Sequence, residues 1–275
     1  EMIATLTRFA TPGLFARFGL PEDRLPVLYN AVDANVHSPA VRVHRERIRG
    51  KHKIPDDAVT FLLVGSGFRR KGLPAMLQAL AALPADNHLL VVGDDRRMDA
   101  WKRTAYDAGV RERVHFTGPQ PDVSPYYGAA DVFVLPTLYD SFPDAAMEAL
   151  ACALPVVTST RSGAAELVTA HDAGFVCDAR DAGALTAHLR TLQDAGLRPT
   201  DGEDARRFAM RLEAAVSELA DESSGDWFSA RLRAHAGDTP GLHGPDDSWI
   251  RDWRSPDRRP QITDSDRRWS SGRTR

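Results

Sequence analysis

The fold of this chain is decided by residues 60–72, which read Thr60-Phe-Leu-Leu-Val-Gly-Ser-Gly-Phe-Arg-Arg-Lys-Gly72. A short apolar run ends at Val64, a loop with three glycines follows, and an amphipathic stretch begins at Leu73. The apolar run is continuous rather than alternating, which is typical of strands that are covered on both faces. The stretch therefore predicts a buried strand, a glycine-rich loop and a helix, in that order.

The same order of strand, loop and helix repeats from about Val59 to Val176. Apolar runs predict strands at residues 60–64, 88–92, 114–117, 131–135, 155–158 and 174–176. Amphipathic stretches predict helices at residues 73–83, 98–108, 123–129, 144–152, 164–169 and 181–192. This alternation predicts an α/β fold with a doubly wound, Rossmann-like parallel sheet. Ligands of such sheets bind outside the carboxyl ends of the strands, so the loops after the strands should hold the chemistry.

Composition excludes several classes of protein. The 275 residues are 43% hydrophobic and 27% charged, as in soluble globular proteins, which excludes disorder throughout. A formal net charge of -3 argues against nucleic acid as a partner. No run approaches the roughly 18 apolar residues of a membrane span, and Glu1-Met2-Ile3 does not resemble a signal peptide. Cys152 and Cys177 cannot form a disulfide framework, so we expect two core cysteines and a reducing, cytoplasmic setting.

The two ends of the chain differ from its middle. Residues 1–50 hold one helix-like piece, the run Pro26–Tyr29 and a basic stretch from Arg42 to Lys53, and we interpret them as the remnant of an N-terminal domain with an interdomain linker. Residues 51–220 form the α/β domain. Residues 221–275 have few apolar side chains, which predicts a disordered polar tail. That segment also holds four of the five tryptophans, so a tail that orders on a partner stays an alternative.

The loop after the first strand carries three consecutive cations, Arg69, Arg70 and Lys71. Glycines allow a ligand close to the backbone, and the N-terminus of the next helix offers unpaired N–H groups. Three cations there suit a phosphate, because cations at a helix N-terminus oppose the helix dipole and need a reason. Charge-assisted hydrogen bonds contribute about 1.5–3 kcal/mol each, against roughly 0.3–1 kcal/mol for the dipole, so the side chains would set the affinity. A solvated turn is the alternative. Arg70 stands where a dinucleotide fingerprint needs a third glycine, and the loop lacks a phosphate-loop ending, so neither motif fits.

A second candidate site follows the strand that ends at Leu135. Ser141 with Asp144 is typical of a helix cap, and Pro143 suits the first helical turn. Glu148 is the only polar residue between Asp144 and Pro155, on an apolar helix, so we expect it to be buried and to meet hydroxyl or N–H groups. An ionised carboxylate can accept from both hydroxyls of a ribose, and Asp140 could face the same crevice. A core glutamate that is satisfied by protein N–H groups is the alternative.

Taken in order, these residues resemble the C-terminal, nucleotide-sugar-binding half of a GT-B glycosyltransferase of family 4, the retaining group 1 enzymes. The resemblance covers roughly Pro26 to Ala220. Its most specific motif is E-x7-E, which appears here as Asp140-x7-Glu148 and runs on into Ala-Leu-Ala-Cys-Ala-Leu-Pro-Val-Val at 149–157. Further matches are Asn30–Asp33, Lys71-Gly72, Val92–Asp94, Val114–Gly118, Ala130-Asp131 and Ser162-Gly163 with Glu166.

The resemblance implies transfer of a sugar from a UDP- or GDP-linked donor to a hydroxyl of a glycan or lipid-linked acceptor, with retention and without a metal or another cofactor. It assigns catalysis to Lys71 at the diphosphate, Glu148 at the ribose and Asp140 at the transferred sugar. Residues 116–118 would border the base, and residues 142–144 would offer backbone N–H groups. The implied donor-binding set is Gly65, Ser66, Gly67, Arg69, Arg70, Lys71, Phe116, Thr117, Gly118, Asp140, Phe142, Pro143, Asp144 and Glu148.

The chain departs from the family pattern at three places. Ser66 stands where the family has an arginine, so Arg69 or Arg70 must substitute. Asp140 replaces the first glutamate of the motif and is shorter by roughly 1.5 Å. We expect that the N-terminal, acceptor-binding domain of the family lies outside these 275 residues, and with it the part through which peripheral membrane association would occur. The alternatives are a non-catalytic nucleotide-sugar-binding module that needs a partner domain, and a different Rossmann-type nucleotide enzyme.

Overall fold

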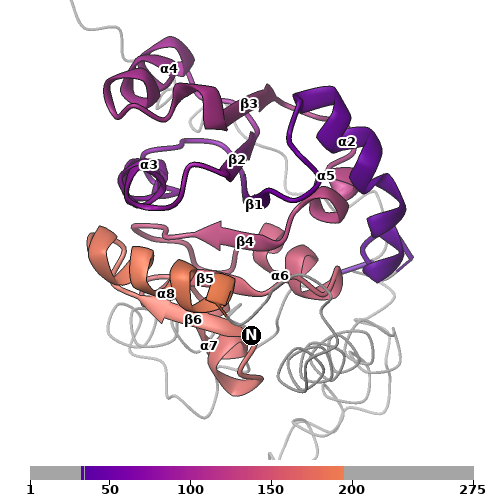
Figure 1. Ribbon diagram of the computed structural model, residues 1–275. Helices are drawn as coiled ribbons and strands as arrows, with labels where there is room; N and C mark the ends of the chain where they lie inside the picture. The colour runs from indigo at the N-terminus through magenta and orange to yellow at the C-terminus, as the bar shows by residue number, and fades with distance from the viewer. Residues whose placement is uncertain (1–31, 34, 195–275) are drawn as a thin grey trace, which may run out of the picture. The chain divides into compact units, whose positions relative to one another are not determined.

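A computed structural model describes residues 32–33 and 35–194, which belong to one compact unit (Figure 1). The expected N-terminal helix, the run Pro26–Tyr29, most of the Asn30–Asp33 match and the tail at 221–275 lie outside the described residues. The extents of the three expected domains therefore stay predictions.

Six parallel strands form one sheet, in the order β3-β2-β1-β4-β5-β6. Their bounds are β1 Val59–Val64, β2 Asn87–Val92, β3 Val114–Gly118, β4 Val132–Leu135, β5 Val156–Ser159 and β6 Gly174–Cys177. Each differs from its predicted range by one or two residues at most. The strand order is that of a Rossmann-like fold, and it reverses between β1 and β4. The predicted fold class is confirmed.

Helices connect the strands as predicted. The longer ones are α2 Arg45–His52, α3 Leu73–Ala82, α4 Met98–Asp107, α5 Ser124–Ala129, α6 Asp144–Ala151, α7 Ala164–Ala170 and α8 Ala182–Asp194. Two short 3-10 helices, η2 Pro39–His44 and η3 Arg111–Arg113, precede α2 and β3. Within the described part of the chain, none of these helices has the length and apolar character needed to span a bilayer.

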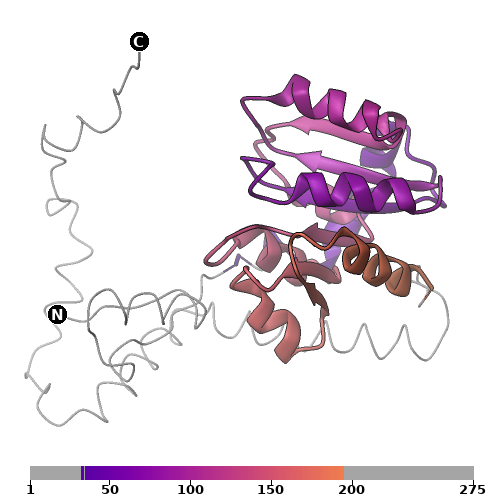
Figure 2. The same ribbon diagram turned by 90° about the vertical axis from the view of Figure 1, so that its left-hand side faces the viewer.

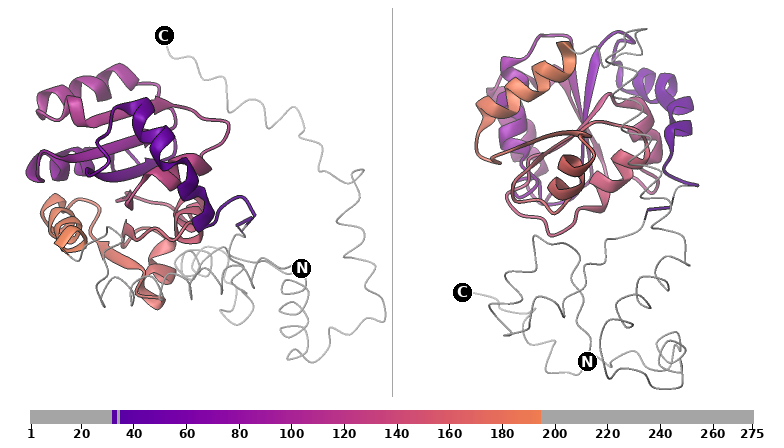
Figure 3. Two further views of the ribbon diagram at one scale, coloured as in Figure 1. Left: turned by 45° about the vertical axis from the view of Figure 1, so that its right-hand side comes forward. Right: turned by 90° about the horizontal axis from the view of Figure 1, so that it is seen from below.

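The sheet is covered on both faces. One hydrophobic cluster packs side chains of α3, α4 and α8 against the sheet, and a second packs those of α2, α5, α6 and α7 against its other face. Figure 2 shows α3, α4 and α8 together in front of the strands, and Figure 3 shows the sheet between its two layers of helices. Cys152 and Cys177 are both buried and free, as predicted. Covering on both faces explains why the strands are apolar without alternation.

A buried arginine ties α2 to the sheet domain. Arg49 has no exposed surface, and its Nη2 lies 2.7 Å from Oδ2 of Asp131, just before β4. Arg45 pairs with the other oxygen of Asp131, also at 2.7 Å. Further guanidinium bonds of Arg49 reach the carbonyl groups of Ala129 and Ala58. Part of the basic stretch that we expected in a linker therefore packs against the α/β domain through these ion pairs, which we call the α2–Asp131 ion pairs. Helix α2 also continues past residue 50, where we expected a domain boundary.

The expected helix cap at Ser141 is wrong. The N-cap residue of α6 is Pro143, which makes no side-chain cap bond, and its carbonyl accepts the N–H of Ala146 at 3.0 Å. Ser141 lies two residues before that position, outside the place from which a cap side chain reaches the first turn. Asp144 falls in the first turn, where its negative charge suits the helix dipole.

Candidate functional site at the carboxyl edge of the sheet

The candidate site lies at the carboxyl ends of β1 and β4, between which the strand order reverses, because ligands of open parallel sheets bind at this point. The loops that follow these two strands contact each other: the N–H of Leu138 and the hydroxyl of Thr137 donate to the carbonyl of Arg70 at 2.8 and 2.9 Å. Gly72 has a φ of +86°, and a Cβ built there would lie 2.0 Å from the carbonyl oxygen of Pro136. Glycine at position 72 is therefore what lets the two loops approach.

The structure brings Lys71 and Asp140 into direct contact. The Lys71 ammonium lies 2.7 Å from Oδ2 of Asp140, and Nη1 of Arg70 lies 3.2 Å from the same oxygen. Lys71 is only 9% exposed and passes over Gly65, where an added Cβ would lie 2.8 Å from its Cε. The backbone of Asp140 is held as well, because its carbonyl accepts the N–H of Gly163 at 2.9 Å. The carboxylate of Asp140 therefore contacts two of the three predicted cations, Arg70 and Lys71.

Glu148 is half-buried rather than buried, with 26% of its side chain exposed. Its Oε2 accepts the hydroxyl proton of Tyr127 at 2.6 Å, and Nε2 of His37 lies 3.8 Å from the same oxygen. Burial, and then the Glu148 carboxylate, raise the pKa of Tyr127 well above its ordinary value, so this phenol stays protonated as a donor. Glu148 therefore meets a hydroxyl of the protein, while its contact with a ribose stays a prediction.

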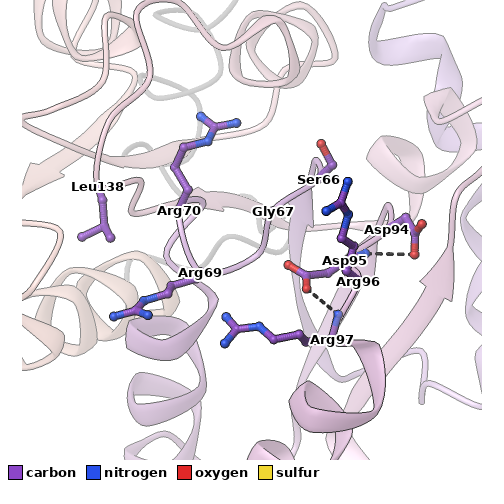
Figure 4. Close-up of a pocket in the computed structure, with 9 residues that line it drawn as sticks. All are labelled: Ser66, Gly67, Arg69, Arg70, Asp94, Asp95, Arg96, Arg97 and Leu138. Atoms are coloured by element: carbon purple, nitrogen blue, oxygen red, sulfur yellow. Dashed lines mark hydrogen bonds between the residues drawn. The ribbon is translucent and has the colours of Figure 1, made fainter. Parts of the chain in front are cut away.

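A pocket of about 700 Å³ opens between the loops that lead into α3 and α4 (Figure 4). It is lined by residues 66–67 and 69–70 of the first loop, residues 94–97 of the second, and Leu138 of the β4–α6 loop. We call it the arginine pocket. Figure 4 shows the side chains of Arg69 and Arg70 extending in different directions, so Arg69 points away from the cations that contact Asp140, which are Arg70 and Lys71.

Asp95 holds the two loops of the arginine pocket together. Its carboxylate accepts the N–H of Phe68 from the first loop and the N–H of Arg97 from its own loop, both at 2.8 Å. Burial alone would raise the pKa of Asp95, but these hydrogen bonds outweigh it and leave the pKa below its ordinary value. Asp95 is therefore a structural anion whose charge is already matched by backbone donors.

The remaining donor-set residues fall into two groups. Gly65, Ser66 and Gly67 lie on the β1–α3 loop beside Lys71, as expected. The Phe142 side chain is buried in the core, and the centroid of the Phe116 ring lies 6.3 Å from that of Phe68. A base-binding role for residues 116–118 and backbone donation by residues 142–144 stay predictions.

Sequence reasoning missed four residues of this region: His37, Arg96, Arg97 and Tyr127. The rule that singled out Arg69 to Lys71, cations directly after a parallel strand, applies equally to Arg96 and Arg97 after β2 and could have found them. No sequence signal marks Tyr127 or His37, because their contact with Glu148 joins segments far apart in the chain. Within the described residues, no group of three or more His, Cys, Asp or Glu side chains is arranged so that it could hold a metal ion.

The strand order and the loops at its reversal define a Rossmann-like α/β domain of the kind found in GT-B proteins. The chain belongs to the family described as glycosyl transferases group 1, whose model matches residues 44–208. A D-inositol 3-phosphate glycosyltransferase of Corynebacterium glutamicum is 29% identical over 217 residues, which cover 74% of this chain and 52% of that protein. The lipopolysaccharide glucosyltransferase WaaG of Escherichia coli is 32% identical over 179 residues, which cover 63% and 48%.

Solved structures share the fold. The crystal structure of WaaG, a glycosyltransferase of lipopolysaccharide biosynthesis, has a TM-score of 0.69 and 25% identity, and the match covers 87% of this chain and 63% of that one. Anabaena Alr3699/HepE in complex with UDP and glucose has a TM-score of 0.70 at 20% identity, with 85% and 63% covered. The chain spans about half the length of the curated relatives it matches.

Proposed function

We propose that this chain supplies the donor-binding half of a retaining glycosyltransferase of family 4. The enzyme transfers a sugar from a nucleoside diphosphate sugar to an acceptor hydroxyl. The observation that carries this proposal is the Lys71–Asp140 contact at the reversal of the strand order, in a chain of the group 1 family. The names of the relatives, which refer to D-inositol 3-phosphate and lipopolysaccharide, support a glycan or lipid-linked acceptor.

The side chains take separate roles in this proposal. Glu148 accepts hydrogen bonds from the ribose, using the oxygen that Tyr127 does not hold. Lys71 has three N–H donors, so it can keep Asp140 and contact the diphosphate at the same time. Asp140 then accepts from a hydroxyl of the sugar being transferred. UDP is the first nucleotide to test, because a neighbour of the same fold carries it.

In the reaction, the bond between the anomeric carbon and the diphosphate oxygen breaks, and its electron pair stays on that oxygen. The acceptor oxygen bonds to the anomeric carbon on the same face, and the acceptor proton passes to the diphosphate. Fixed positive charge at Lys71 stabilises the leaving group, so we propose chemistry that does not depend on a metal. A second, N-terminal domain holds the acceptor in the cytoplasm and provides any contact with a membrane surface.

Calorimetric titration of the chain with UDP, GDP, UDP-glucose and NAD tests this proposal. We expect a uridine or guanosine diphosphate to bind, and Glu148→Ala to weaken that binding at least 10-fold because the ribose loses its acceptor. Binding of NAD in preference to both diphosphates would overturn the proposal in favour of another Rossmann-type enzyme.

Turnover separates the enzyme from a non-catalytic module. The alternative is that the chain binds a nucleotide sugar and transfers nothing without a partner domain. Release of UDP from UDP-glucose by the isolated chain would reject that alternative. Binding of UDP-glucose without release of UDP would support the non-catalytic module. That outcome would agree with a chain that spans about half the length of its relatives.

A further inference from the structure

We infer that His37 is a specificity-determining residue of the nucleotide site: its Nε2–H donates to a ribose hydroxyl whose proton Glu148 accepts. This role rests on the proposed function, in which Glu148 accepts hydrogen bonds from the ribose. His37 contacts the substrate directly in this role, whereas Tyr127 acts on the ribose only through Glu148.

The fold fixes His37 next to Glu148. The backbone N–H of His37 donates to the carbonyl of Asp33 at 2.8 Å, which closes a turn just before η2. Helix η2 packs so closely on α5 that a Cβ built at Gly128 would clash with a carbonyl oxygen of η2. The ring of His37 meets that of Tyr127 edge-on, with the ring centroids 5.8 Å apart. The helix that carries the hydroxyl donor of Glu148 therefore also positions this imidazole.

The imidazole proton belongs on Nε2 of His37. The other ring nitrogen, Nδ1, is buried and has no hydrogen-bond partner among the described residues. A proton on Nδ1 would be left without an acceptor there, which is costly for a buried N–H. Nε2 instead lies 3.8 Å from Oε2 of Glu148, so a proton on this nitrogen is stabilised by the carboxylate. We therefore assign the Nε2–H tautomer.

The carboxylate of Glu148 does not take up this donor. The distance of 3.8 Å is longer than the roughly 2.7–3.2 Å of an N–H···O hydrogen bond. Asp122 interacts electrostatically with His37 from the β3–α5 loop, but its Oδ1 already accepts from the N–H and the hydroxyl of Ser124. The side chains of His37 and Glu148 are 15% and 26% exposed, so a ligand can reach both.

A ribose hydroxyl can use both groups at once. It has one proton and two lone pairs, so it can donate to Glu148 and accept from the Nε2–H of His37. Two hydrogen bonds of about 2.8 Å span up to about 5.6 Å, so one oxygen can bridge atoms that are 3.8 Å apart. A sugar without this hydroxyl leaves both protein groups unpaired, and sites of this kind reject such analogues. The preferred ligand is therefore a nucleoside diphosphate with an intact ribose.

Paired calorimetric titrations test this role. The ligands are the diphosphate that the wild type binds, UDP or GDP, and its 2′,3′-dideoxy form, which lacks both ribose hydroxyls. His37→Phe keeps an aromatic ring against Tyr127 but removes the N–H, so we expect it to weaken binding of the ribonucleotide roughly 5-fold. Binding of the dideoxy form should change less than about 2-fold, because no hydroxyl is there to lose a donor. His37→Gln restores an N–H donor and should recover most of the affinity.

His188→Phe is the matched control. It makes the same change on α8, at the other face of the sheet, where the His188 ring stacks on Phe175 with the centroids 4.5 Å apart. We expect wild-type affinity of this variant for both nucleotides. Thermal melting checks that the His37 variants fold.

Three results would overturn the role of His37 while Glu148→Ala still weakens ribonucleotide binding. One is an unchanged affinity of His37→Phe, and another is an equal loss for the ribonucleotide and the dideoxy form, which would indicate a structural role. The third is an effect of His37→Phe that vanishes in a Glu148→Ala background, which would show that His37 acts only through Glu148. A wild type that binds neither UDP nor GDP would instead overturn the proposed function, and this role with it.

Discussion

Glu148 is oriented by a phenol that water does not reach. Tyr127 is 1% exposed, and its ring packs beside Phe133 and His37, so its hydroxyl is fixed where the carboxylate needs a donor. A hydroxyl carries one proton, and the 2.6 Å contact with Glu148 is shorter than the 3.1 Å contact with the carbonyl of Ala145. We conclude that the proton goes to the carboxylate, which leaves Oε1 as the oxygen for a ligand.

Removing that hydroxyl should disturb nucleotide binding without unfolding the protein. We expect Tyr127→Phe to weaken UDP binding roughly 5-fold, because an oriented charge-assisted hydrogen bond contributes about 1 kcal/mol or more. Tyr126→Phe is the matched control, since that hydroxyl meets Lys51 rather than Glu148. Equal UDP affinity of the two variants in calorimetry would show that Tyr127 does not position Glu148.

The sequence was enough to predict which residues form the candidate site, but not which side chains contact one another there. The positions of Lys71, Asp140 and Glu148 follow from strand ends and from one motif. Their partners do not, because a hydrogen bond such as Tyr127 to Glu148 depends on how α5 and α6 pack. The expected burial of Glu148 was wrong for the same reason: periodicity shows an apolar helix, but not which of its positions lies at the edge of the core.

At the scale of elements, two loops meet at one glycine. The N-cap of α3, Gly72, touches the loop after β4 so closely that no side chain fits. The sequence placed both loops after their strands, since each strand end was predicted within two residues. It could not show that the loops touch, because strand order is a property of the whole sheet.

Gly72→Ala should therefore destabilise the fold and separate the loops. We expect a loss of at least about 2 kcal/mol in the free energy of unfolding, from the positive φ and the contact with Pro136. Gly50→Ala is the control, because that helical glycine has open space around it and alanine favours a helix by about 1 kcal/mol. Urea unfolding compares them, and similar stability of the two variants would contradict the account.

The ion pairs that Arg45 and Arg49 of α2 make with Asp131, next to β4, lead to a second prediction about how elements are held together. Asp131→Ala leaves the buried Arg49 without its carboxylate and removes the acceptor of the Thr60 N–H, so we expect a loss of about 3–5 kcal/mol in the free energy of unfolding. Asp99→Ala, which removes an exposed partner of Lys102, should cost under about 0.5 kcal/mol. If Asp131→Ala loses less than about 1 kcal/mol in the free energy of unfolding, measured with urea, the ion pairs of Asp131 do not hold α2 against the sheet.

For the whole molecule, the end of the sheet opposite the site carries a group of three histidines. His88 and His115 lie near the amino ends of β2 and β3, with Nδ1 of one 3.0 Å from Nε2 of the other, and the ring of His52 lies 5.8 Å from that of His115. Burial, and then the neighbouring His88 and His52, lower the pKa of His115 to about 4. Burial also lowers the pKa values of His52 and His88. The folded state therefore favours neutral rings.

This group should make the domain sensitive to acid. A histidine whose pKa is lower in the folded state stabilises the fold fully above its unfolded pKa, near 6.5, and loses that contribution as pH falls toward 4. We expect the free energy of unfolding to fall by on the order of 2 kcal/mol between pH 7 and pH 4.5 because of His115, measured by urea unfolding. His115→Phe should reduce this slope, and an unchanged slope would contradict the assignment.

The central claim is that this domain binds a nucleoside diphosphate at the point where its strand order reverses. Calorimetric titration of Lys71→Ala with UDP tests it most directly, beside Lys102→Ala, which removes the same charge from an exposed position of α4. The account predicts at least 10-fold weaker binding for Lys71→Ala and wild-type affinity for Lys102→Ala. Wild-type affinity of both variants would contradict it.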